Sequence, residues 1–261
     1  MAEPNPSEVR ELKEALIRGA RFLQETGVLS HSFHGNMSVR VPGTDHLVMT
    51  GSSLARGLRT EELVVVDLQG HLLDGELDPV AAEIVQMHTS VYFKRPDVCS
   101  VIHTHSPHAT AFAVASKPIE CVYEGLVRAG IVDPVPVAKY APRGSDESVK
   151  NIMDVVGTRD KAVLLENHGI LAFDRDVMSA ARVIVLLEEA AELTIRASLV
   201  GTPKKIAAQM IEYAQERAQR FAQRGTIRAE SATGAEISDS SRKANPPTKR
   251  AAGLNSEEGA P

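Results

Sequence analysis

Two histidines one residue apart, His103 and His105, are the residues whose types and spacing point most directly to chemistry. The residues before them, Val98–Ile102, are mostly apolar and β-prone, so we expect the pair at the end of a strand. Side chains two residues apart on a strand point to the same face, so both imidazoles can reach one metal ion. A pattern of two histidines also arises by chance, and its interpretation depends on further residues.

Two further residues complete a possible metal site. Glu83 lies upstream in an amphipathic segment, and His168 lies far downstream in the sequence ENHG, at a predicted strand-to-strand turn. Three neutral imidazoles and a carboxylate form a catalytic type of metal site that leaves a position open for substrate. The alternatives are a solvated helix residue for Glu83 and a turn histidine bonded to its own backbone for His168.

Composition limits the class of protein. The net charge of −5 gives no electrostatic reason to expect nucleic-acid binding. No apolar run approaches the roughly 20 residues needed to cross a bilayer, and the polar, acidic N-terminus argues against a secretory signal. Cys99 and Cys121 are the only cysteines, which fits a reduced cytoplasmic protein better than a disulfide scaffold. We therefore expect a soluble cytoplasmic protein without nucleic-acid or membrane partners.

Apolar periodicity predicts helices and short strands along the chain. The first helix is expected to be capped by Ser7, and another to begin at Asp78-Pro79, because Asp is a common N-cap and Pro suits the first turn. The latter helix is expected to turn Ala82, Val85, Thr89 and Tyr92 toward the core. Two long helices follow later, over Met178–Leu199 and Pro203–Phe221. The predicted strands are Ser38–Val41, His46–Thr50, Leu63–Asp67, His71–Leu73, Val98–His103, Val135–Lys139, Ala162–Glu166 and Ile170–Phe173.

These strands are mostly separated by turns rather than by regular helical crossovers. That arrangement predicts an α/β fold with a largely antiparallel sheet flanked by helices. Residues 1–224 are expected to form one catalytic domain. From about Gly225 the composition shifts to small and polar residues, which cannot bury enough apolar area to offset the entropy of ordering. We therefore expect residues 225–261 to be a disordered tail.

Five local motifs together resemble the class II aldolase/adducin family. The resemblance extends from about Glu8 to Phe221. Each motif alone is weak evidence for membership of the family, but the five motifs in this order and at this spacing are specific to it. The motifs are HGNMSVR (34–40), TGSS (50–53), Glu83 followed by a helix, VIHTHSPHATAF (101–112) and LLENHGILAF (164–173).

The resemblance implies a fold, an assembly and roles for the site residues. It implies an α/β/α sandwich around a mainly antiparallel sheet, and a homotetramer with active sites at subunit interfaces. His103, His105 and His168 match the metal ligands of the family, and Glu83 matches its acid/base carboxylate, which can also coordinate the metal. A divalent cation chelated by two substrate oxygens stabilises the enediolate formed when a carbon–carbon bond breaks. Zn²⁺ and Mn²⁺ are the expected metals, with Fe²⁺ or Co²⁺ also suited to three imidazoles.

The substrate residues match the sugar-phosphate aldolases only in part. Asn36, in a Gly-Asn pair, and the hydroxyls of Ser52 and Ser53 match two elements of the phosphate site in those relatives. Ala81-Ala82 stands where they have two serines, so the resemblance implies a substrate without phosphate. Arg56 and Arg128 are then candidates to bind a substrate carboxylate, although each could equally be a solvated surface charge.

These departures favour the decarboxylase branch of the family, which includes dihydroxyphthalate decarboxylases. The expected function is a metal-dependent decarboxylase of a hydroxylated aromatic (di)carboxylic acid. Tyr123 lies near a tyrosine that some aldolase relatives use as a proton donor, and His108 could assist protonation or bond a metal ligand. One alternative is an aldolase acting on a small hydroxy-carbonyl or sugar-phosphate substrate. A non-catalytic, adducin-like interaction module is a more distant alternative, because such modules have lost the metal residues.

Overall fold

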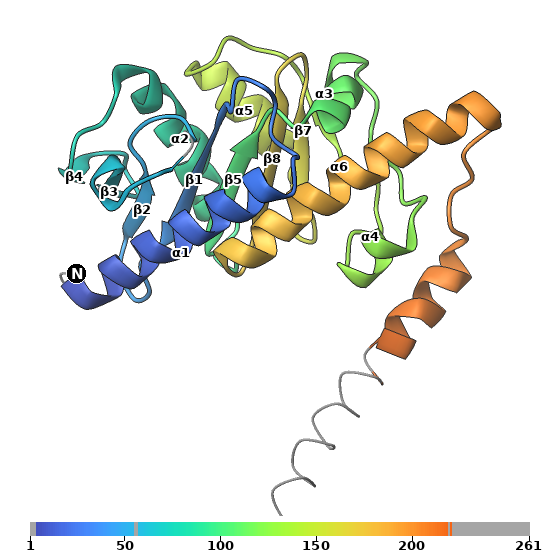
Figure 1. Cartoon of the computed structure of the whole chain (residues 1–261), viewed down its shortest axis with the longest axis horizontal. Coiled ribbons are helices and arrows are strands. Elements are labelled where there is room, and N and C mark those ends of the chain that lie inside the picture. Colours follow the sequence, from blue (N-terminus) through green and yellow to red (C-terminus); the bar gives the residue numbers. More distant parts are fainter. Residues whose placement is uncertain (1–3, 55–56, 219, 221–261) are drawn as a thin grey trace, which may run out of the picture. The chain divides into compact units, whose positions relative to one another are not determined.

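One mixed sheet organises the computed structural model, which describes residues 4–54, 57–218 and 220 (Figure 1). Within these residues the sheet has eight strands in the order β4-β3-β2-β1-β5-β8-β7-β6. The strands are β1 (Gly35–Arg40), β2 (His46–Thr50), β3 (Leu63–Asp67), β4 (Leu72–Asp74), β5 (Ser100–Thr104), β6 (Val137–Ala138), β7 (Ala162–Leu165) and β8 (Gly169–Asp174). All neighbours pair antiparallel except β6 and β7, which are parallel. The predicted antiparallel character of the sheet is confirmed.

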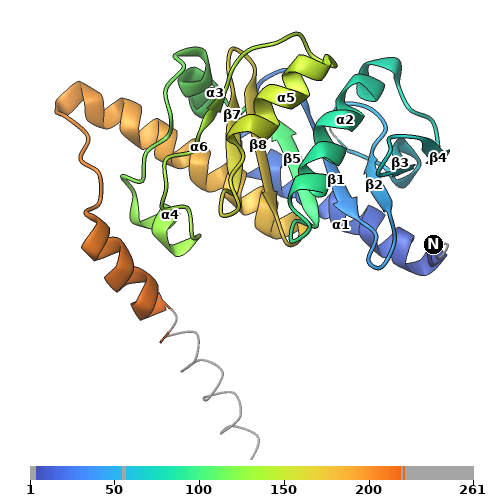
Figure 2. The same cartoon turned by 180° about the vertical axis from the view of Figure 1, so that it is seen from behind.

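Helices cover both faces of this sheet. They are α1 (Pro6–Glu25), α2 (Pro79–Lys94), α3 (Pro107–Val114), α4 (Glu124–Arg128), α5 (Asp146–Val155) and α6 (Val177–Val200), with a 3₁₀ turn η1 (Thr60–Glu62). Figure 1 shows α1 and α6 in front of the strands, and Figure 2 shows α2 and α5 on the opposite face. The α/β/α sandwich is therefore confirmed.

Two separate hydrophobic clusters follow from the alternation of side chains along the strands. Along β8, Ile170 and Ala172 belong to the cluster that α1 and α6 cover, whereas Leu171 and Phe173 belong to the cluster under α2 and α5. The strands in the middle of the sheet, β1, β5 and β8, are buried along almost their whole length, because helices cover both faces.

Several local predictions differ from the structure. Asn5, not Ser7, caps α1, because the Asn5 side chain accepts a hydrogen bond from the Ser7 backbone N–H. Ala82 is exposed, and Ala81 is the buried alanine of α2. The last predicted helix begins only at residue 208, and the segment before it is fixed by a hydrogen bond from Ile206 N to Cys121 O.

Three helices were not predicted from the sequence. The helices α3, α4 and α5 are short, and α3 and α4 are 8 and 5 residues long. Such lengths give too few turns for apolar periodicity to be recognised. The predicted tail, 225–261, lies outside the described residues. Among the described residues, no helix is both long enough and apolar enough to cross a membrane.

Candidate metal centre and active site

Three histidines from three different places in the chain meet at one end of the sheet. His103 is in β5, His105 follows that strand directly, and His168 is in the turn between β7 and β8. One nitrogen of each imidazole lies within 4.8 Å of the others, and the His103 and His105 Nε2 atoms are 3.1 Å apart. Two nitrogens each about 2.1 Å from a tetrahedral zinc ion would be about 3.4 Å apart. The spacing therefore fits one shared metal ion.

The hydrogen bond of His103 fixes which of its nitrogens can bind a metal. Its Nδ1 is 2.9 Å from the carbonyl oxygen of Ile170, on the paired strand β8. A carbonyl only accepts, so Nδ1 carries the proton and Nε2 keeps its lone pair. Metal-bound histidines commonly have their second nitrogen fixed in this way. This geometry, together with the chemistry of the three donors, fits a divalent metal ion.

Burial and mutual repulsion keep the three imidazoles neutral. Burial lowers the pKa of His103 well below its usual value, and the neighbouring His168 and His105 add to the effect. Burial, His168, His34 and Arg143 lower the pKa of His105 to about 4. The pKa of His168 is lowered by burial and by the charge of Arg143. Neutral imidazoles need not lose a proton before they bind a metal.

The turn that carries His168 brings two strands unusually close. Asn167 has a left-handed backbone with φ 56°, a conformation that Asn tolerates better than most residues. A Cβ placed on Gly169 would lie 2.5 Å from the carbonyl oxygen of Thr104 and 2.9 Å from Cδ2 of His105. Glycine at this position therefore lets β8 approach the residues that carry the metal site.

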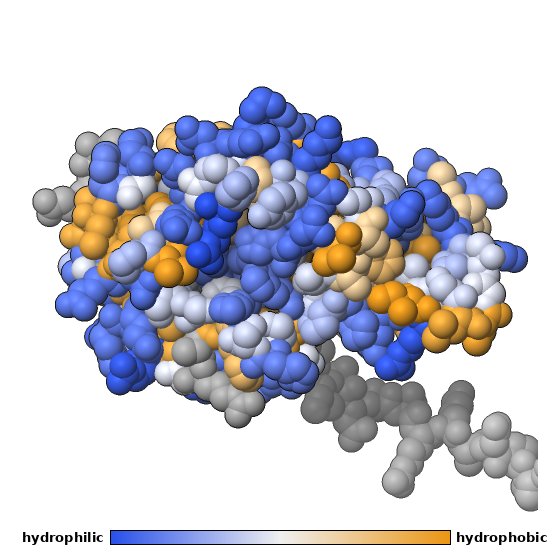
Figure 3. Space-filling view, turned by 90° about the horizontal axis from the view of Figure 1, so that it is seen from above, coloured by the Kyte–Doolittle hydropathy of each residue, from blue (hydrophilic) through white to orange (hydrophobic). Residues whose placement is uncertain are grey.

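A cleft of about 440 Å³ surrounds the three histidines. Three predicted substrate residues, Asn36, Ser52 and Ser53, line it. Asn36 pairs directly with His103 across β1 and β5, which places both side chains on one face of the sheet. β1 begins and β5 ends at the upper side of Figure 1. Figure 3 looks down on this side and shows mostly hydrophilic side chains around a hollow.

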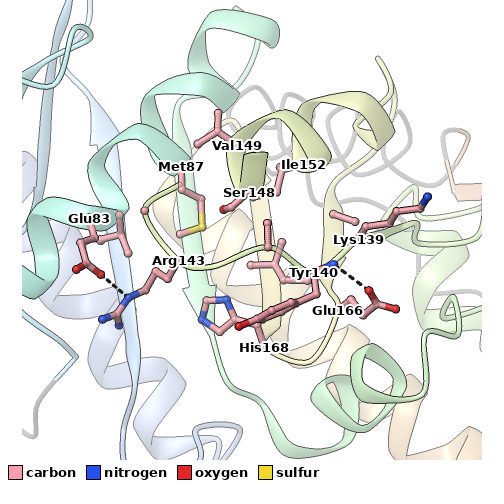
Figure 4. Close-up of a pocket in the computed structure, with 15 residues that line it drawn as sticks. Glu83, Met87, Lys139, Tyr140, Arg143, Ser148, Val149, Ile152, Glu166 and His168 are labelled. Carbon is pink, nitrogen blue, oxygen red and sulfur yellow. Dashed lines mark hydrogen bonds and ion pairs between the residues drawn. The ribbon is translucent and has the colours of Figure 1, made fainter. Parts of the chain in front are cut away.

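Glu83 lies beside the three converging histidines rather than among them. Among the described residues, the group whose ligand atoms converge contains the three histidines alone. The Glu83 carboxylate accepts from Arg143 at 2.9 Å, and each side chain is about half exposed. Three other residues of α2, Val80, Ala81 and Ile84, line the cleft. Figure 4 shows Arg143 reaching toward Glu83, with His168 on the other side.

His108 contacts α6 and is not among the residues that line the cleft. Its Nδ1 and its backbone N–H lie 2.8 and 2.9 Å from Glu188 Oε1, and the N–H of Ala109 donates to Oε2. The buried Glu188 carboxylate therefore satisfies the free N–H groups at the start of α3, directly after the histidine pair. Sequence reasoning missed Glu188, although an acidic residue inside an apolar helix was a signal for it.

The remaining predicted residues lie elsewhere in the chain. Tyr123 donates to Glu189 at 3.3 Å, and the negative charge of Glu189 raises the pKa of the phenol. Arg128 forms an exposed pair with Glu124 on α4. Neither residue lines the cleft of its own chain. Arg56 lies outside the described residues.

His34 and Arg143 also line the cleft, and neither was predicted as a site residue. His34 precedes Gly35-Asn36, and its ring lies 5.4 Å from that of His105. The HGN sequence was a usable signal, because the histidine adjoins a predicted substrate residue. Arg143 lies in the loop before α5 and reaches the cleft because α5 packs beside α2. Nothing in the local sequence around Arg143 indicated this position.

Comparison with known proteins agrees with this geometry. The family described as Class II Aldolase and Adducin N-terminal domain matches residues 14–195. The chain belongs to this family. It is 32% identical over 207 residues to the 5-methylthioribulose-1-phosphate/5-deoxyribulose-1-phosphate aldolase of Rhodospirillum rubrum, covering 79% of this chain and 90% of that protein. It is 34% identical over 190 residues to the 3-oxo-tetronate 4-phosphate decarboxylase of Haemophilus influenzae, covering 69% and 85%.

A solved structure of this class II aldolase family shows the same fold. An L-fuculose 1-phosphate aldolase superposes with a TM-score of 0.69 at 28% identity, covering 80% of this chain and 96% of that one. The family resemblance predicted from the motifs is confirmed, and the chain is a lyase. Both aldolases and a decarboxylase occur among its relatives, and none of the three proteins named here acts, by its name, on an aromatic acid.

Proposed function

We propose that this class II aldolase-family chain is a divalent-metal-dependent lyase that breaks a carbon–carbon bond in a small phosphorylated hydroxy-carbonyl compound. The observation that carries the proposal is the convergence of His103, His105 and His168 inside a cleft that Asn36 and Ser53 also line. A bound Zn²⁺ or Mn²⁺ would supply a Lewis acid for the electron pair released by the broken bond. The metal residues are retained, which favours an enzyme over an adducin-like module.

A phosphate is favoured despite the two missing serines. The relatives named above act, by their names, on phosphorylated compounds. Ala81 lies in the first turn of α2 and lines the cleft, where the helix dipole attracts anions. The Val80 N–H of this turn already donates to the Asp78 side chain. The side chains of Asn36, Ser52 and Ser53 line the same cleft and provide hydrogen-bond donors in place of the two missing serine hydroxyls.

Among the carbon–carbon lyase reactions of this family, the position of Arg143 favours the decarboxylation of a hydroxy-oxo acid. Its guanidinium is the positively charged group among the described residues that line the cleft with His105 and His168, and it suits a carboxylate through two parallel hydrogen bonds. Its half-exposed pair with Glu83 is worth about 1 kcal/mol or less. A substrate carboxylate would therefore displace Glu83 from Arg143 at little cost.

This exchange would give Glu83 a role in proton transfer. Loss of CO₂ leaves an electron pair on carbon, and a proton must then be delivered to that carbon. Glu83, released from Arg143, would take up a proton from water and pass it to that carbon. Tyr123 would act only across a subunit interface, in a homotetramer of the kind that the family resemblance implies.

Aldol cleavage is the second candidate. The aldolase of Rhodospirillum rubrum matches more of this chain than the decarboxylase does. Retro-aldol cleavage would use the same metal site and phosphate donors but would not require a carboxylate partner. The role of Arg143 therefore separates the two reactions.

A substrate panel tests the function and the choice between these reactions. Metal-loaded protein is incubated with 3-oxo-tetronate 4-phosphate, 5-deoxyribulose 1-phosphate, fuculose 1-phosphate and a dihydroxyphthalate, and CO₂ and aldehyde release are measured. We expect CO₂ from the oxo-acid phosphate, and an increase in KM of at least about 10-fold in Arg143→Gln. Aldehyde release that is insensitive to Arg143→Gln would favour the aldolase. Turnover of the dihydroxyphthalate alone would support the aromatic substrate instead.

A further inference from the structure

A chain of hydrogen-bonded polar side chains runs from Asn36, at the wall of the cleft, to the buried Tyr92. His88 Nε2 lies 2.6 Å from Asn36 Oδ1, and His88 Nδ1 lies 2.7 Å from the hydroxyl of Ser38. The Ser38 hydroxyl in turn lies 2.8 Å from the hydroxyl of Tyr92. His88 and Ser38 are completely buried, and Tyr92 is 1% exposed. The metal-binding histidines are not part of this chain.

The acceptor at one end sets the direction of every bond. An amide oxygen only accepts, so Nε2 of His88 must carry its proton and donate to Asn36. Burial lowers the pKa of His88 to about 3, so the imidazole is neutral and its Nδ1 is a bare acceptor. The Ser38 hydroxyl then donates to Nδ1, and the Tyr92 hydroxyl donates to Ser38. One consistent set of donors and acceptors satisfies all four groups.

The directions of these hydrogen bonds also decide which end of the Asn36 amide faces the cleft. Its Oδ1 is held by His88, whereas its NH₂ group has no partner within the described part of the chain. Asn36 lines the cleft and stands opposite His103 in the sheet. The amide therefore offers two hydrogen-bond donors beside the metal site. Without His88, the oxygen could turn to the cleft and repel an anion.

We propose that His88 is a positioning residue that holds the Asn36 amide with its NH₂ group toward the cleft, where it donates to an anionic oxygen of the substrate. The inference rests on the proposed function for the identity of that anion. An apolar residue would fill the same buried position without the cost of burying an imidazole. The geometry thus gives His88 a task beyond packing.

Binding of inorganic phosphate to the metal-loaded protein tests this inference without any activity assay. His88→Met keeps the approximate volume but removes the donor to Asn36. We expect phosphate binding, measured by calorimetry, to weaken at least about 10-fold while the metal content stays unchanged. His71→Met is the matched control, because His71 is exposed at the β3–β4 turn and pairs with Asp67. It should bind phosphate like the wild-type protein.

The tautomer of His88 provides a second measurement on the unchanged protein. Nitrogen NMR of the imidazole should show a protonated Nε2 and a bare Nδ1. A protonated Nδ1 would overturn the inference even if His88→Met failed to fold. Wild-type phosphate affinity in a folded His88→Met protein, or no phosphate binding by the wild type, would also overturn it.

These outcomes are distinct from failure of the proposed function. If no member of the substrate panel is cleaved but His88→Met weakens phosphate binding, the lyase assignment fails and the role of His88 stands. If the lyase activity is found but His88→Met binds phosphate normally and leaves KM unchanged, the role of His88 fails and the function stands.

Discussion

Replacing Gly169 with alanine should damage the metal site through a steric conflict that can be measured. The new Cβ would lie 2.5 Å from the carbonyl oxygen of Thr104, about 0.9 Å short of the 3.4 Å at which ordinary contact begins. It would also lie 2.9 Å from Cδ2 of His105 and 3.2 Å from Cε1 of His103. The Thr104 oxygen belongs to the backbone at the end of β5, which is paired on both sides, and it has little room to move.

The expected cost has two parts. Forcing an extra carbon into a well-packed site costs about 1–3 kcal/mol. In a domain of this size each kcal/mol lowers Tm by about 2–4 °C. Displacement of His105 and His103 should in addition weaken metal binding by about 10-fold to 100-fold, the range found when the support of a metal ligand is lost.

The assay compares metal-free and metal-loaded proteins. Tm of the metal-free protein reports the packing cost, and a competition titration with a chelator reports the metal affinity. Gly201→Ala is the matched control, because no atom lies within 4 Å of a Cβ at that position and its φ of 169° is open to any residue. A Gly169→Ala protein with wild-type Tm and wild-type metal affinity would refute the close approach of β8 to the histidine pair.

Three further predictions address the metal site and its surroundings. His168→Ala should remove most bound metal and nearly all activity while the fold survives, as metal analysis and circular dichroism would show; full metal occupancy would exclude His168 as a ligand. Glu83→Gln should keep the metal but lower turnover by at least roughly 100-fold, because it removes a proton-transferring group, and near-normal turnover would exclude that role. The free energy of unfolding of the metal-free protein should fall as pH drops from 6.5 toward 3, because unfolded His88 takes up a proton that folded His88, with a pKa of about 3, does not. This group contributes about 1.4 kcal/mol per pH unit in that window, so His88→Met should show a shallower pH dependence in urea titrations, and an unchanged slope would contradict the neutral, buried state.

The amino-acid sequence alone was enough to predict the fold class and to single out the three histidines that converge in the structure. His103 and His105 belong to one strand, and strand geometry requires their side chains to share a face. His168 could be added because its turn resembles a family motif. Strand alternation and the turn-rich connections were local signals as well, so the antiparallel sheet followed from them.

The tertiary structure decided which partners the charged side chains near the site contact. Arg143 and Glu188 act through contacts with residues 60 and 80 positions away in the sequence, which local patterns do not reveal. The separation of Glu83 from the histidine cluster depends on the rotation of α2, and one residue along a helix turns a side chain by about 100°. His88 gives the clearest case. Its sequence context is that of an ordinary buried helix residue, and only the packing of α2 on β1 places its ring between Asn36 and Ser38.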